Sequence, residues 1–275
     1  METLERDTGD SKEASSSAEI QNSWVEAQDS LKTRLVTEDD FRWQLPTTTA
    51  AATTLVGGGG ECEVLKYVGG VDISFAKDDP SVACGTLVVL DLQTLEVVYE
   101  DYSAVTLHIP YVPGFLAFRE VPILLQLLEK MKTCDHPFYP QMLMVDGNGI
   151  LHPRGSQSYW KSLDPLLMLW VGLSSGCSGK SSNYWDRKEL RQLLETKGTH
   201  DDILTLRGDS GRTWGAAMRS NPGSFKPIYI SVGHRVSLAT AVKIARMTSK
   251  YRVPEPIRQA DIRSRDYLRK HQSAG

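Results

Sequence analysis

Asp146 is the acidic residue with the most informative surroundings in this sequence. It follows the apolar run Met142–Val145, which is too short for a helix and fits a strand covered on both faces, and it precedes Gly147 and Gly149, which break regular structure. We therefore expect Asp146 at the carboxyl edge of a strand, where ligand sites collect in open α/β sheets and where a carboxylate can hold a hard cation. The structural alternative is an aspartate that only begins a turn.

Two further acids are expected near this edge. Asp72 lies in the middle of an apolar strand pattern, and burying a carboxylate without a partner costs several kcal/mol, so it requires a hydrogen-bonding partner or a metal ion. Glu120 precedes Pro122, which is tolerated only in the first turn of a helix, so Glu120 is expected near a helix start. The helix dipole alone would favour an acid there, which is the structural alternative.

The chemistry of such a cluster follows from its ligand type. Carboxylates without cysteine or imidazole ligands favour Mg²⁺ or Mn²⁺ over zinc, and such ions activate water and neutralise charge on a phosphodiester. Asp261 could join the cluster, and His234, with His152 nearby, could shuttle a proton for the attacking water. A histidine that follows a strand can equally be structural.

Alternating and helical patterns predict the elements that position these residues. Short turns between the first three strands favour an antiparallel meander. A short helix with a charged outer face is expected from Trp24 to Leu35, and Ser237 is expected to cap a later helix. The predicted strands span residues 67–75, 83–90, 96–107, 142–145 and 227–232, and the main predicted helices span 121–131, 186–197, 237–251 and 257–270.

Composition places the chain among ordinary globular proteins. It has 275 residues, of which 40% are hydrophobic and 24% charged. Its four cysteines form no Cys-x-x-Cys pair, and the longest apolar stretch, residues 166–171, is far below the ~20 residues that span a bilayer. We expect a soluble intracellular protein with an acidic, partly disordered extension and Gly-rich linker over residues 1–62, a compact domain over 63–271 and a tail over 272–275.

Charge is unevenly distributed along the chain. Residues 1–42 carry eleven acids and five bases, whereas residues 243–271 carry nine Lys and Arg and three acids. A basic carboxyl-terminal face suits a phosphate backbone, although a solvated helix surface gives the same pattern.

Five ordered blocks resemble the endonuclease V family, which comprises inosine-specific nucleases with a ribonuclease-H-like fold. They are residues 68–75, 110–120, 145–155, 231–237 and 252–264. The resemblance implies a mixed α/β sheet, with three antiparallel strands followed by parallel ones and helices on both faces. It implies Asp72, Glu120 and Asp146 as ligands of Mg²⁺, for which Mn²⁺ can substitute, with His234 and Asp261 supporting catalysis.

The resemblance also implies how the substrate is held and cut. A wedge would enter the nucleic acid beside the lesion, because exposing one base requires unstacking it. Hydrolysis would occur at the second phosphodiester bond 3′ to inosine in RNA or DNA and leave 5′-phosphate and 3′-hydroxyl ends. A monomer in the cytoplasm and nucleus or nucleolus, without membrane contact, is expected. The implied substrate-binding residues are Pro110, Tyr111, Val112 and Pro113 of the wedge, Gly114 and Leu116 beside the inosine pocket, and Gly147, Gly149, His152 and Arg154.

Residues 156–185 depart from the family pattern. The family continues with a glycine/histidine helix and a strand that ends in a valine-alanine-lysine-type motif, whose lysine lies at the active site, and neither is present. We therefore expect this chain to lack a core helix and a core strand. One alternative is a protein that binds inosine-containing strands without turnover. A remote alternative is a nucleotide-binding loop at residues 176–181, in which Ser174 replaces the required first glycine.

Overall fold

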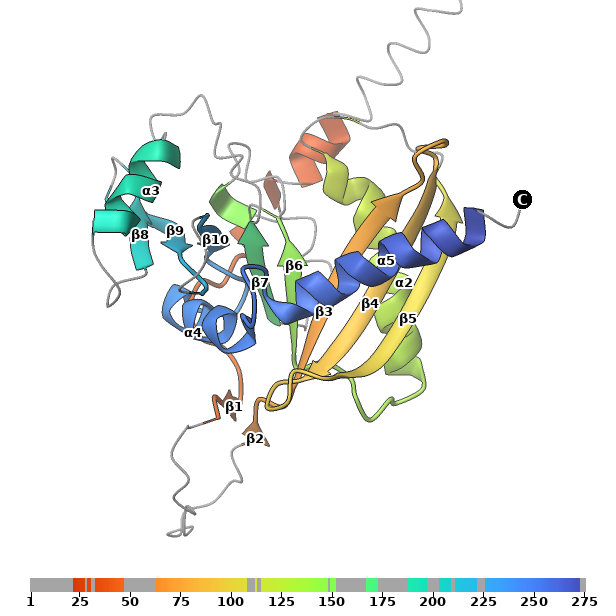
Figure 1. The fold of residues 1–275 in the computed structure, drawn as a ribbon, viewed down its shortest axis with the longest axis horizontal. Helices are drawn as coiled ribbons and strands as arrows, with labels where there is room; N and C mark the ends of the chain where they lie inside the picture. Colours follow the sequence, from red (N-terminus) through yellow and green to blue (C-terminus); the bar gives the residue numbers. More distant parts are fainter. Residues whose placement is uncertain are drawn as a thin grey trace, which may run out of the picture.

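A mixed β-sheet forms the centre of the molecule (Figure 1). The computed structural model describes residues 22–27, 29–30, 33–46, 63–107, 112, 115–147, 149–151, 167–172, 187–196, 203–208, 211–221 and 226–272. Within these residues the strand order is β5-β4-β3-β6-β7-β10-β9-β8. The strands are β3 (Tyr67–Phe75), β4 (Val82–Asp91), β5 (Val97–Thr106), β6 (Met142–Asp146), β7 (Leu167–Gly172), β8 (Ile203–Arg207), β9 (Thr213–Met218) and β10 (Ile228–Ser231).

The first three strands of this sheet form an antiparallel meander. Strand β4 pairs with β3 on one side and with β5 on the other. The turn between β4 and β5 is closed by Asp91, whose Oδ1 accepts the backbone N–H groups of Gln93 at 2.9 Å and Thr94 at 3.1 Å. Strands β6 and β7 extend the sheet in parallel with β3, and β10 returns antiparallel to β7. The predicted mixed sheet is therefore confirmed.

Strand β7 corrects the expectation that residues 156–185 lack a core strand. It lies between β6 and β10, and its backbone pairs with β6 from Met142↔Leu167 to Asp146↔Val171. A strand between two neighbours needs backbone hydrogen bonds and apolar residues, and the run 166–171 supplies the apolar residues. The family motif was therefore not required for a strand to form at this position.

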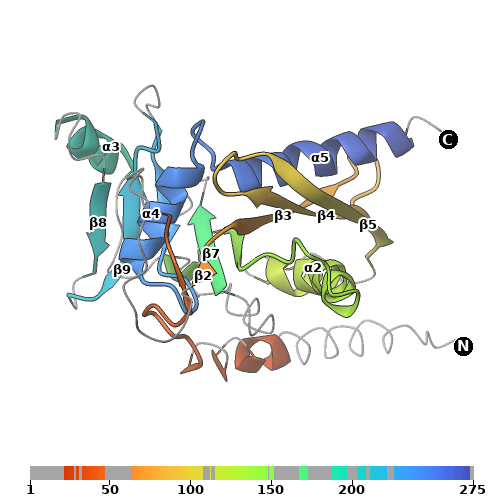
Figure 2. The same ribbon diagram turned by 90° about the horizontal axis from the view of Figure 1, so that it is seen from below.

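Helices cover both faces of the sheet (Figure 2). Helix α2 packs on one face, where Val121 and Leu124 contact a cluster that includes Val71 and Val145. Helices α4 and α5 lie on the other face, where Ile244 and Ile257 join a second cluster. The helices are α2 (Leu116–Thr133), α3 (Arg187–Thr196), α4 (Leu238–Thr248) and α5 (Glu255–Gln272), and a short 3₁₀ helix, η1, spans Gly149–Leu151. The predicted Ser237 cap of α4 is confirmed, because its side chain accepts the N–H of Thr240.

Helix α2 begins earlier than its sequence suggested. Its first residue is Leu116, so Pro122 lies inside the helix and Glu120 lies in the second turn. The expectation that Glu120 sits at the helix start was therefore wrong. The buried apolar face of the helix stabilises the extra turn despite the N–H that proline lacks.

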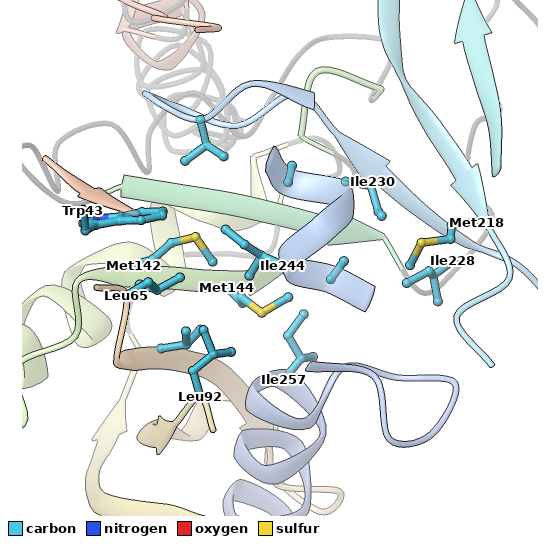
Figure 3. Packing of buried hydrophobic residues seen from close by; sticks show 14 residues of the cluster. Trp43, Leu65, Leu92, Met142, Met144, Met218, Ile228, Ile230, Ile244 and Ile257 are labelled. Carbon is cyan, nitrogen blue, oxygen red and sulfur yellow. The ribbon is translucent and has the colours of Figure 1, made fainter. Parts of the chain in front are cut away.

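The second cluster includes a residue from the N-terminal part of the chain (Figure 3). Trp43 is 6% exposed and packs in the same core as Leu65, Met142 and Ile244. It belongs to β1 (Trp43–Gln44), which pairs in parallel with β2 (Glu63–Val64). Residues that precede the predicted domain boundary thus contribute to the core. No helix among the described residues is long and apolar enough to cross a membrane.

Gly70 allows α5 to approach the sheet closely. A Cβ atom at this position would lie 2.1 Å from the backbone carbonyl oxygen of Pro256 at the start of α5. The side chain of residue 70 must therefore be a hydrogen atom, and the contact lies two residues before Asp72.

We expect Gly70→Ala to lower the free energy of unfolding by about 2 kcal/mol or more, because backbone must move to relieve the overlap. Urea denaturation measures this change. Gly211→Ala is the matched control: its φ is +75° but nothing lies within 4 Å of its added Cβ, so a cost of only about 1 kcal/mol is expected. Equal costs for the two variants would contradict close packing at Gly70.

Candidate active site

Two of the predicted metal ligands lie side by side on neighbouring strands. In the parallel pair of β3 and β6, Val71 is level with Val145, so the next residues, Asp72 and Asp146, are also level, about 5 Å apart between backbones. Val71 and Val145 both pack against α2. Because side chains alternate along a strand, Asp72 and Asp146 project toward the opposite face, where α5 lies. The carboxyl-edge position predicted for Asp146 is confirmed.

Two serines hold the carboxylate of Asp72. The Ser264 hydroxyl of α5 lies 2.6 Å from Asp72 Oδ2, and the Ser74 hydroxyl lies 3.4 Å from the same oxygen. The two hydroxyls also lie 2.7 Å from each other. Burial raises the pKa of Asp72, and the hydrogen bonds from Ser264 and Ser74 oppose this rise without cancelling it. Asp72 is therefore a partly buried carboxylate whose orientation is fixed by α5.

Glu120 approaches from the other side of the sheet. It lies on α2, and burial together with the negative charges of Asp72 and Asp146 raises its pKa to about 8, while Arg119 acts in the opposite direction. Like charges in a partly desolvated site disfavour simultaneous ionisation. The three carboxyl groups therefore share one electrostatic environment at this edge.

The donor set fits a divalent cation chemically. Carboxylate oxygens are the preferred ligands of Mg²⁺, and a cation would relieve the repulsion that raises the pKa of Glu120. Among the described residues, however, no three His, Cys, Asp or Glu side chains lie close enough together to form a ready-made metal site. The three carboxylates come from three different elements, Asp72 from β3, Asp146 from β6 and Glu120 from α2.

Asp261 lies beside this cluster but has its own partner. It is on α5, where its carboxylate forms an ion pair with Arg265, one turn later on the helix. Its backbone carbonyl accepts a hydrogen bond from the Ser264 hydroxyl at 3.0 Å, and that serine contacts Asp72. Asp261 is therefore placed one turn from the residue that orients Asp72.

His234 lies at a different level of the sheet. Strand β10 runs antiparallel to β7, and Ile230 is level with Val171, which is level with Asp146. From Ile230 the chain runs toward the amino end of β6. His234 therefore lies on the order of 10 Å along the strand direction from the level of Asp146. There its Nδ1 accepts the N–H of Val36 at 3.5 Å. This placement favours the structural alternative for His234 over a role in moving protons at the carboxylates.

The predicted substrate-binding residues are only partly described. Leu116 is the first residue of α2 and is 37% exposed, and the Val112 carbonyl accepts the N–H of Phe115 at 3.0 Å. Gly147 directly follows β6, and Gly149, with φ of 52°, begins η1. Outside the described residues lie Pro110, Tyr111, Pro113, Gly114, His152 and Arg154.

Ser264 is a site residue that the sequence did not predict. It is fully buried and lies on the face of α5 that packs against the sheet. The signal was present, because a serine at a helical spacing otherwise occupied by apolar residues needs a buried partner. The buried residues of this face are Ile257, Ala260, Ser264 and Leu268.

Comparison with known proteins identifies the family. The sequence model of endonuclease V matches residues 52–262. Human endonuclease V is 42% identical over 250 residues, which cover 90% of this chain and 83% of the human protein. The chain belongs to the endonuclease V family. Members are nucleases that hydrolyse phosphodiester bonds, and Asp72 and Asp146 lie on a ribonuclease-H-like sheet.

Solved endonuclease V structures have the same fold. The catalytic domain of human endonuclease V superimposes with a TM-score of 0.79 at 39% identity, covering 94% of this chain and 99% of that one. Endonuclease V of Ciona intestinalis, in complex with a 24mer DNA containing an inosine followed by a ribo-adenosine, gives a TM-score of 0.77 at 29% identity. That match covers 92% of this chain and 99% of the Ciona chain.

The raised pKa of Glu120 gives a pH dependence to stability. Between about pH 4.5 and 8 the Glu120 carboxyl group keeps its proton in the folded protein but has lost it in the unfolded chain. The free energy of unfolding should therefore fall as the pH rises through this window. We expect Glu120→Gln to reduce this fall by on the order of 2 kcal/mol. Urea denaturation at several pH values in EDTA measures it. Glu129→Gln changes an exposed acid of the same helix and should keep the wild-type slope, whereas a wild-type slope in Glu120→Gln would contradict the assignment.

Removing the Ser264 hydroxyl should raise the pKa of Asp72 further, because a donor to the charged form is lost. We expect Ser264→Ala to cost about 1–3 kcal/mol of unfolding free energy at pH 7. Carboxyl NMR titration and denaturation measure the two effects. Ser81→Ala removes an exposed serine–aspartate hydrogen bond of 2.7 Å and should have almost no effect. An unchanged Asp72 titration would rule out the role given to Ser264.

Proposed function

We propose that this protein is a metal-dependent endonuclease that cleaves inosine-containing RNA or DNA at the second phosphodiester bond 3′ to inosine, leaving 5′-phosphate and 3′-hydroxyl ends. The observation that carries the proposal is the level placement of Asp72 and Asp146 on neighbouring strands, with Glu120 electrostatically coupled to both. The inosine-containing DNA bound by the Ciona relative supports the substrate class.

The carboxylates would hold Mg²⁺, or Mn²⁺ in its place, through Asp72, Asp146 and Glu120. When bound, such an ion supplies Lewis-acid activation of water and neutralises charge at the scissile phosphate. Ser264 and Ser74 keep the Asp72 carboxylate oriented, since both contact one of its oxygens.

Basic side chains beside the three carboxylates suit the binding of a phosphate backbone. A cavity of about 550 Å³ adjoins Ser74 and is lined by Lys77, Arg265 and Arg269, with Asp78 as its acidic residue. Basic side chains next to hydrolytic carboxylates bind backbone phosphates without reading sequence. The wedge beginning at Pro110 would then expose the inosine, with Leu116 at the border of its pocket.

A second candidate is binding of inosine-containing strands with slow or no cleavage. Strand β7 restores the sheet, but the residues that follow Gly172 are Leu-Ser-Ser-Gly, without the lysine that the family places at its active site. A missing cationic group would weaken charge stabilisation in the transition state more than it weakens binding.

The test is cleavage of matched oligonucleotides with and without inosine, as RNA and as DNA. We expect metal-dependent cutting that requires inosine and is lost in EDTA, and a fall of about 10²-fold or more in Asp72→Asn and Asp146→Asn. Asp79→Asn, at an exposed turn, is the control and should retain activity. Tight inosine-dependent binding without cleavage in Mn²⁺ would select the binding protein. Cutting that ignores inosine or metal would contradict the proposal.

A further inference from the structure

The N-terminal part of the chain contacts both ends of the sheet. We use the term N-terminal strap for its described residues between 22 and 46, which precede the residues 52–262 matched by the family. One end packs beside the start of α2, and the other enters the core beneath α4 (Figures 1 and 2). The strap therefore connects the active-site edge of the sheet to its opposite end.

Two aspartates attach the strap at the end far from the carboxylates. Asp39 accepts the Ser237 N–H and the Thr240 hydroxyl of α4, both at 2.7 Å. Asp40 forms an ion pair with Arg235 at 2.9 Å. Both aspartates are exposed, so each of these bonds alone contributes little, and the attachment depends on several of them acting together.

Main-chain bonds and apolar packing reinforce this attachment. The Arg235 N–H donates to the Val36 carbonyl at 2.7 Å, and the Asp40 N–H donates to the Arg235 carbonyl at 3.1 Å. Phe41 stacks on Trp43, which is buried in the core. The role of His234 is part of this attachment, since its ring accepts the Val36 N–H.

The other end of the strap meets the helix that carries Glu120. Residues 22–27 are helical, and the Trp24 ring stacks on Phe118 at 5.0 Å and lies 5.5 Å from Phe115. Phe115 directly precedes α2, and both phenylalanines are buried. Such aromatic contacts hold the helix start in place.

We propose that Trp24 is a positioning residue for Glu120, acting through Phe115 and Phe118, and that Asp39 anchors the strap that delivers it. Phe118 is two residues before Glu120, in the same part of α2, so a shift of that turn moves the carboxylate. The contact between Trp24 and Phe115 also supports the end of the predicted wedge, residues 110–113, because the Phe115 N–H donates a hydrogen bond to the Val112 carbonyl. Displacements of about 1 Å at a reacting group can cost 10²-fold in rate. This inference rests on the proposed nuclease activity.

The test compares the 275-residue chain with its variants Trp24→Ala, Trp24→Phe and Val25→Ala. Val25 is 42% exposed on the same helix and serves as the control. In cleavage of inosine-containing RNA with Mg²⁺, we expect Trp24→Ala to lower kcat about tenfold or more while KM changes less than about threefold. Trp24→Phe should restore most of kcat, because it keeps an aromatic ring over Phe118.

The anchor is tested with Asp39→Ala against Glu38→Ala, its exposed neighbour. Asp39→Ala should reproduce the kcat loss, and the double variant with Trp24→Ala should be no worse than either single variant, because both release the same strap. Unchanged kcat in either single variant, or fully multiplicative losses, would overturn the inference.

Hydrogen exchange separates this inference from the proposed function. Amides of residues 115–121 should exchange faster in Trp24→Ala and Asp39→Ala, while those of β3 and β4 stay protected. Loss of protection throughout the sheet would mean a general folding role and would overturn the inference. If the wild type does not cleave, the proposed function fails, and exchange alone still decides whether the strap holds α2.

Discussion

Repulsion between carboxylates at one edge of the sheet is the constraint on which the site depends. Asp72 and Asp146 are brought level by parallel pairing, and Glu120 is held within their electrostatic reach by α2. Folding alone would disfavour this arrangement, because Asp72 and Glu120 are partly desolvated and Glu120 lies near the negative charges of Asp72 and Asp146. The three carboxylates keep this arrangement because β-sheet pairing and helix packing fix the backbone at all three positions.

Helix α5 fixes the orientation of the Asp72 carboxylate. Its close approach over Gly70 brings the Ser264 hydroxyl to the carboxylate, so one glycine and one serine, distant in sequence, determine one oxygen position. Basic residues of the same helix, Arg265 and Arg269, line a cavity that adjoins Ser74, next to Asp72. A single helix thus supplies both the serine that orients Asp72 and the basic side chains that lie beside it.

The sequence predicted five of the eight strands of the main sheet and most helices, because their apolar periodicity is strong, but it did not predict β7 or β8. Strand β9 was missed, since its Gly-Ala-Ala run has little β propensity and its pairing depends on Gly215, where a Cβ would lie 2.3 Å from the Ile230 carbonyl. The three carboxylates were predictable from their positions in strand and helix. The contact of Ser264 with Asp72 depends on how α5 packs on the sheet, and the distance of His234 from the carboxylates depends on the direction of β10. Local sequence patterns contain neither kind of information.

Strand β7 forms inside residues 156–185, a segment whose sequence was expected to lack a core strand. It lies between β6 and β10, and its ladder of backbone pairs with β6 runs from Met142↔Leu167 to Asp146↔Val171. An interior slot of this kind selects for hydrophobicity and length alone, so wholesale replacement of its residues is structurally silent. The strand order of such a sheet therefore constrains an interior strand far less than it constrains a residue whose side chain must reach a defined point.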